Sequence, residues 1–208
     1  DYDNDGLMDL ILSNGHPDDL IEARGRSVTY REPMILFHNE GNGKMLNVSK
    51  QSGEVFKKRI SARGLAVGDL NNDGYPDLVV GVNGGAPLVL YNNAESKNNW
   101  LGLKLAGTTS NPAAIGTIIK WSAGGKAHRR LKNAGGSFMS SHDPREIAGL
   151  GKAEKVDWLE IRWPRPSLRV DAPPWPACGP LQLSSCKSVP YDRGRQGNRG
   201  PVVLIGFQ

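Results

Sequence analysis

Short apolar runs separated by turn residues dominate the first half of the chain. The runs lie at 7–13, 34–39, 64–70, 77–82 and 87–92, and each is bounded by Gly, Asn or Asp. Runs of this length between such residues are typical of β-strands. The stretch NEGNGK at 39–44 predicts a hairpin turn, because Asn and Gly tolerate the positive φ that tight hairpins need. The long polar stretch 14–33 predicts an excursion from this strand framework.

The region 97–166 alternates between apolar and polar positions, which also predicts strands. Two sets of apolar residues each fall on one strand face: Leu101, Leu103 and Leu105, then Leu159, Ile161 and Trp163, with Trp158 on the opposite face of the second strand. No segment shows a convincing helical period. The chain is therefore expected to be all-β, with a strand-rich region at 1–96 and a small β-domain at 97–166.

The composition changes again after Trp163. Residues 164–201 hold eight of the fourteen prolines and both cysteines, Cys178 and Cys186. Proline lacks a backbone donor and is excluded from central strands and helix interiors. We therefore expect 167–208 to be a disordered tail, or a segment translated out of frame. Whether the two cysteines pair stays open.

Charge divides the chain into unlike parts. Residues 1–99 hold 14 acidic and 10 basic residues, 100–166 hold 5 and 11, and 167–208 hold 2 and 5. This asymmetry argues against an evenly basic nucleic-acid-binding protein. No apolar run approaches the roughly 18–20 residues that span a membrane. The chain begins with Asp1 rather than Met, and we expect it to be a piece of a longer protein.

The candidate chemistry lies in an acidic pattern, D-x-[D/N]-x-D-G-x-x-D, that occurs twice. The predicted ligands are Asp1, Asp3, Asp5, the carbonyl of Leu7 and Asp9 in the first copy, and Asp69, Asn71, Asp73, the carbonyl of Tyr75 and Asp77 in the second. Alternating oxygen-bearing side chains and a Gly that permits a sharp turn can wrap Ca²⁺, which takes six to eight oxygen ligands.

The flanks of these loops distinguish them from EF-hands. An EF-hand has helices on both sides and a Glu at position twelve, whereas here that position is Leu12 or Val80 and the flanks are strand-like. An Asx-rich turn without an ion is the alternative, but two matching copies favour a cation. We expect the second loop to be the better preformed site, because a predicted strand precedes it.

Catalytic patterns are missing from the sequence. The four histidines, His16, His38, His128 and His142, lack metal-type spacing, and we expect each to be solvated or hydrogen-bonded. Clustered carboxylates can hydrolyse glycosides, but acids that hold Ca²⁺ have no free proton role. If 126–132 forms a strand, Lys126, His128 and Arg130 share one face that could attract an acidic glycan, although a solvated surface is the simpler interpretation.

Several segments resemble known families. DLNNDGYPDLVVGVNGGAPLVLYNN at 69–93 resembles an FG-GAP/VCBS repeat, and the segments that begin NNWLGLKL, DPREIAGLG and VDWLEIRWP resemble an ASPIC/UnbV domain. The resemblance covers about 1–166. It implies a fragment of a secreted, cartilage acidic protein-like molecule, with two incomplete blades of a calcium-binding β-propeller joined to an ASPIC/UnbV-type domain.

Taken together with the missing catalytic patterns, these observations predict a non-enzymatic extracellular or cell-envelope calcium-binding module with an interaction or adhesion role. The resemblance names no ligand; we expect an unidentified extracellular protein or an acidic glycan as the partner, and neither a nucleic acid nor a transmembrane segment of this fragment. An accessory domain or fragment of a secreted enzyme that acts on polysaccharide is the alternative.

Overall fold

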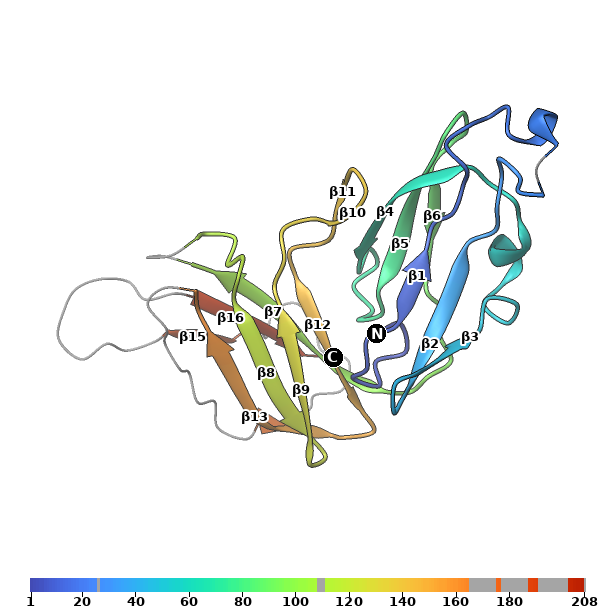
Figure 1. The fold of residues 1–208 in the computed structure, drawn as a ribbon. Helices are drawn as coiled ribbons and strands as arrows, with labels where there is room; N and C mark the ends of the chain where they lie inside the picture. The colour runs from blue at the N-terminus through green and yellow to red at the C-terminus, as the bar shows by residue number, and fades with distance from the viewer. Residues whose placement is uncertain (26, 108–110, 165–174, 177–186, 191–201, 208) are drawn as a thin grey trace.

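The computed structural model describes every residue except 26, 108–110, 165–174, 177–186, 191–201 and 208. Nearly all regular elements are strands, so the expected all-β class is confirmed. An N-terminal unit (1–96) contains two three-stranded sheets, and a C-terminal unit (97–208) contains two four-stranded sheets (Figure 1). Among the described helices, none has the length and apolar character needed to cross a membrane.

The two sheets of the N-terminal unit are antiparallel and share the same simple order. The first contains β1 (Leu10–Leu12), β2 (Ile35–Gly41) and β3 (Lys44–Asn47), and the second contains β4 (Ala62–Gly68), β5 (Asp77–Val82) and β6 (Leu88–Leu90). The predicted hairpin joins β2 to β3, with positive φ at Asn42 and Gly43. Two short 3₁₀ helices, η1 (Glu22–Arg24) and η2 (Glu54–Lys57), lie in the connections. Each predicted apolar run of 1–96 therefore contains a strand.

A shared core holds these two sheets together. Its buried members are Met34, Leu36, Phe56, Ala62, Leu65 and Val80, and Leu78, Leu88 and Leu90 pack against them from the second sheet. The alternation along β5 places Leu78 and Val80 toward this core, and leaves Val79 on the opposite face. Each sheet thus covers one face of the other.

The C-terminal unit is built from two four-stranded sheets around a second core. One sheet has the order β12 (Glu146–Gly151), β7 (Asn99–Ala106), β16 (Val202–Phe207) and β15 (Lys187–Pro190). The other has the order β14 (Trp175–Pro176), β13 (Lys155–Arg162), β8 (Ile118–Ala123) and β9 (Lys126–Leu131). Side chains of β7, β8, β12 and β13, together with Ala114 and Trp163 outside these strands, form the core, which includes both predicted apolar sets. Trp158 is 39% exposed on the opposite face, as predicted.

A small hairpin of the C-terminal unit reaches back to the N-terminal unit (Figure 1). It consists of β10 (Gly136–Ser137) and β11 (Ser140–Ser141), both of which contact β4. Just beyond it, the amide of Asp143 donates to the carbonyl of Val67, and the amide of Val67 donates to Nδ1 of His142. The free edge of β4 is therefore partly paired.

The C-terminal tail differs in part from its expectation. Three short strands, β14, β15 and β16, fall within 167–208, and β16 pairs with β7 from Val202–Ala106 to Phe207–Leu101. These strands were not expected, because β14 and β15 lie within the proline-rich stretch and contain Pro176 and Pro190, and β16 directly follows that stretch. Cys178 and Cys186 lie outside the described residues. The reading frame of the tail stays a prediction.

Candidate functional site

The first acidic loop, residues 1–9, is shaped by its own side chains. The amides of Asp5, Gly6 and Leu7 donate in turn to carboxylate oxygens of Asp3, Asp1 and Asp5, at 3.4, 3.3 and 2.7 Å. Asn4 and Gly6 have positive φ values of 60° and 90°. Such turns are the local reason for Asp, Asn and Gly at these positions.

The second acidic loop, residues 69–77, repeats this arrangement 68 positions later. The amides of Asp73, Gly74 and Tyr75 donate to side-chain oxygens of Asn71, Asp69 and Asp73, at 3.2, 3.0 and 2.8 Å. Asn72 and Gly74 have φ values of 59° and 85°, close to those of their counterparts. The sequence repeat is therefore a repeat of local structure.

The ninth residue of each loop ties the loop to its sheet. Asp9 accepts hydrogen bonds from the amides of Tyr2 at 2.9 Å and Asn39 at 2.8 Å. Asp77 accepts the matching bonds from the amides of Leu70 and Asn92, each at 2.8 Å. The carboxylate at position nine thus closes the loop and joins it to β2 in the first copy and to the segment just after β6 in the second.

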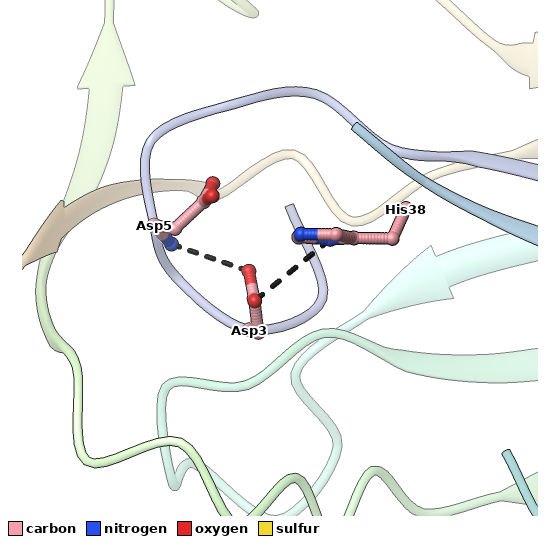
Figure 2. A group of neighbouring side chains, drawn as sticks. All are labelled: Asp3, Asp5 and His38. Atoms are coloured by element: carbon pink, nitrogen blue, oxygen red, sulfur yellow. Dashed lines mark hydrogen bonds and ion pairs between the residues drawn. The ribbon is translucent and has the colours of Figure 1, made fainter. Parts of the chain in front are cut away.

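Carboxylate oxygens converge in the first loop. Asp1, Asp3 and Asp9 each offer an oxygen within 4.8 Å of the others, and so do Asp3 and Asp5 together with a ring nitrogen of His38 (Figure 2). Burial, followed by the charges of Asp5 and Asp9, raises the pKa of the Asp3 carboxyl. Like charges gathered in this way repel, so a bound cation would stabilise the arrangement.

The carboxylates of the second loop are less closely gathered than we expected. Among the described residues, none of its carboxylates belongs to a group of three acidic or histidine ligands within 4.8 Å. The side-chain amide of Asn71 instead donates to Asp73 at 2.7 Å. Burial raises the pKa of the Asp69 carboxyl. The preceding strand β4 is present, but the expectation that the second loop would be the better gathered site does not match this geometry.

Sequence reasoning missed His38 as a member of the site. Nδ1 of His38 lies 3.2 Å from Oδ1 of Asp9 and 3.9 Å from Oδ2 of Asp3. Antiparallel pairing of Leu10 with Phe37 brings His38 beside Asp9. The only signal in the sequence was the position of His38 inside an apolar run, and strand register is needed to use it.

The first loop is also the meeting point of the two units. The carbonyl of Asp3 accepts hydrogen bonds from Ser96 at 2.6 Å and Asn98 at 2.8 Å, both in the connection between β6 and β7. The carbonyl of Asn4 accepts the amide of Gly151 of β12 at 2.9 Å. The side chain of Asn4 donates to the carbonyl of Gly74 at 3.0 Å, which joins the two loops.

Part of the basic face predicted along 126–132 takes part in the contact between the two units. Arg130 donates to the carbonyl of Ile147, lies 3.8 Å from Glu146, and approaches Oδ2 of Asp1 at 3.9 Å. His128 stacks on Trp121, with ring centroids 5.2 Å apart. Both side chains therefore face the protein, so they form a poor surface for a glycan. Lys126 of the same predicted face is exposed.

Arg145 connects the C-terminal unit to the second loop. Its guanidinium donates to the carbonyl of Asp69 and, at 2.6 Å, to the side-chain oxygen of Asn72. Asp143 holds the same guanidinium through both carboxylate oxygens. Each acidic loop therefore contacts the C-terminal unit through an arginine.

Comparisons with known proteins match two family models to different parts of the chain. The FG-GAP-like repeat model matches residues 1–80, and the ASPIC and UnbV model matches residues 107–171. Cartilage acidic protein 1 of Xenopus tropicalis is 28% identical to the chain, over 79% of this chain and 24% of the relative. The chain thus spans about a quarter of the length of this curated relative. The resemblance noted from the sequence is confirmed.

Proposed function

We propose that this chain, an FG-GAP-like repeat region followed by an ASPIC and UnbV region, is a non-enzymatic extracellular calcium-binding module with an interaction role. The observation that carries the proposal is the acidic loop that occurs twice with the same hydrogen bonds, and whose carboxylates converge in the first copy. FG-GAP-like repeats and the similarity to cartilage acidic protein 1 support an extracellular location.

The donor chemistry of the loops fits calcium. Ca²⁺ prefers carboxylate and carbonyl oxygens in a flexible arrangement. The first loop would supply Asp1, Asp3, Asp5, Asp9 and the Leu7 carbonyl, and the second Asp69, Asn71, Asp73, Asp77 and the Tyr75 carbonyl. A buried oxygen of Asp1, Oδ2, accepts no hydrogen bond and has the guanidinium of Arg130 only at 3.9 Å, so its charge is incompletely paired, which favours a bound cation. The ion would neutralise the gathered carboxylates and hold the loop closed.

The fold we propose for the N-terminal unit is part of a β-propeller. Two small antiparallel sheets with a shared core fit neighbouring blades, although each has three strands where a propeller blade has four. A complete propeller has four to eight blades, so the remaining blades would come from a longer protein. The interaction partner, an extracellular protein or an acidic glycan, would bind such a larger assembly.

Calorimetric and thermal titration with calcium tests this function. Extracellular calcium modules bind with Kd on the order of 10⁻⁴–10⁻³ M, and binding to the folded state raises the melting temperature. We expect Asp5→Asn to remove more of the binding heat than Asp73→Asn, because the carboxylates gather in the first loop. Asp19→Asn, at an exposed acid outside both loops, is the matched control. A parent chain that shows neither heat nor a melting shift refutes the proposal.

The alternative, a fragment of a polysaccharide-acting enzyme, draws on a cleft of about 1500 Å³ between the two units. Acids in its lining include Asp143 and Glu146. Arg145 already holds Asp143, and Lys132 lies 3.3 Å from Glu146. Glycoside hydrolysis needs an acid free to donate a proton, so the pairings of Asp143 and Glu146 make these two acids poor candidates for that role.

A further inference from the structure

One donor beside the first loop, the imidazole of His38, does not suit calcium. His38 of β2 brings an imidazole to the three carboxylates of Asp3, Asp5 and Asp9, and Figure 2 shows its ring directed toward Asp3 and Asp5. Nδ1 of His38 is buried and takes part in no hydrogen bond, although it lies 3.2 Å from an oxygen of Asp9. A buried polar atom without a partner is unusual and calls for an explanation.

The second loop lacks this donor. Asn39 and Asn92 make matching amide bonds to the ninth carboxylates, so the residues before them, His38 and Tyr91, occupy equivalent positions. Tyr91 is 57% exposed and belongs to no metal-ligand group among the described residues. The nitrogen donor therefore distinguishes the first loop from an otherwise equivalent second loop.

An independent observation at the same loop points to a cation. The side chain of Asp1 is 4% exposed, and its Oδ2 accepts no hydrogen bond. Nη2 of Arg130 lies 3.9 Å from this oxygen, beyond hydrogen-bonding distance, and the α-amine of Asp1 lies 3.6 Å from Oδ2 of Asp9, so neither cation makes a hydrogen bond with the Asp1 oxygen. The Asp1 carboxylate nevertheless belongs to the converging group with Asp3 and Asp9. A buried, incompletely paired carboxylate is stabilised by a metal ion.

We propose that the first loop, together with His38, is a mixed carboxylate–imidazole site that binds a late first-row divalent metal ion such as Zn²⁺. Imidazole nitrogen suits zinc, whereas calcium prefers oxygen ligands alone. For such sites, affinity rises toward the end of the first transition row, so zinc would compete with calcium at the first loop but not at the second. This inference rests on the same loop as the proposed calcium function and gives the loop a second ligand class.

Zinc titration of the whole chain, with His38→Gln as the variant and His16→Gln as the control, tests the proposal. We expect His38→Gln to weaken zinc binding at least about tenfold, because the loss of a group that only orients a metal ligand already costs about 10–100-fold in affinity. The urea midpoint of His38→Gln, compared with that of the parent, shows whether the variant is folded independently of any metal. A loss of zinc binding with an unchanged midpoint then reports the missing imidazole.

Nuclear magnetic resonance of the ¹⁵N-labelled chain gives a direct readout. Zinc should shift the ring nitrogen Nδ1 of His38 and leave His16 unaffected. Zinc affinity that is equal in the parent and His38→Gln, or a His38 ring that does not respond to zinc, overturns the inference even if calcium binds. Zinc binding through His38 in a chain that binds no calcium would support the inference and refute the proposed calcium function.

Discussion

Substituting alanine for Gly74 tests the contact between the second loop and the C-terminal unit. A Cβ atom at Gly74 would lie 1.7 Å from Cε2 of Trp100, in the strand β7. Real Cβ atoms do not approach other atoms this closely, so the indole ring or the loop would have to move. The φ of +85° at Gly74 adds backbone strain for any residue with a Cβ.

The size of the effect follows from these two contributions. A left-handed backbone costs a residue with a side chain about 1–2 kcal/mol. Forcing extra atoms into a packed site costs about 1–3 kcal/mol more. Gly84→Ala provides the matched control, because Gly84 has a φ of +69° with nothing within 4 Å of its added Cβ. We therefore expect a loss of unfolding free energy of about 2–5 kcal/mol for Gly74→Ala, and only the backbone part for Gly84→Ala.

Urea unfolding followed by tryptophan fluorescence measures both variants. The difference between them isolates the contact with Trp100, because the backbone strain is similar in the two glycines. Equal losses would mean that Trp100 does not lie against the second loop in solution. The described contact between the two units would then be wrong at this point.

Three further predictions concern the core and the junction. Leu103→Ala should lower the unfolding free energy by about 2–5 kcal/mol, because Leu103 is 1% exposed, whereas Leu46→Ala at a 49% exposed position should cost less than about 1 kcal/mol; similar urea midpoints for the two variants would contradict this. Arg145→Lys should speed amide hydrogen exchange in the second loop, because a lysine cannot donate at once to the Asp69 carbonyl and the Asn72 side chain; unchanged exchange would show that Arg145 does not hold the loop. Burial alone would raise the pKa of Asp143, but hydrogen bonds from Arg145 outweigh it and bring the pKa below the usual 3.8. Asp143 therefore stabilises the fold above that pH and loses this contribution as the pH falls through its folded pKa. The difference in urea midpoint between the parent and Asp143→Asn should be present at about pH 7 and should shrink as the pH is lowered below the ordinary pKa of 3.8, and a difference that does not shrink in acid would rule out the ionised carboxylate as its source.

Local pattern predicted much of the secondary structure. The alternation of Leu101, Leu103 and Leu105 identified the buried face of β7, since side chains alternate across a strand whatever the surrounding fold. The Asn and Gly residues of the β2–β3 hairpin were equally informative, because they permit the required backbone angles. The acidic loops could be aligned from spacing alone, and the structure gives them the same internal hydrogen bonds.

Contacts between distant segments could not be predicted in this way. His38 joins Asp9 only through the register of β1 and β2, and register depends on pairing that a single sequence does not display. The contacts of Arg130 and Arg145 with the loops depend on how the two units meet. The strand β16 follows a stretch whose prolines obscured it, and it pairs with β7 about a hundred residues earlier in the chain.

The hydrogen bonds to the first loop limit where this protein can be divided into shorter polypeptides. Composition and charge place the boundary between the units near residue 96, yet the carbonyl of Asp3 is held by Ser96 and Asn98 from both sides of that boundary. Gly151 likewise holds the carbonyl of Asn4. A polypeptide ended at residue 96 would keep Ser96 but lose Asn98 and Gly151, so the carbonyl of Asp3 would lose one of its two donors and that of Asn4 would lose the Gly151 amide. The boundary that composition and charge suggest therefore coincides with hydrogen bonds that join the two units.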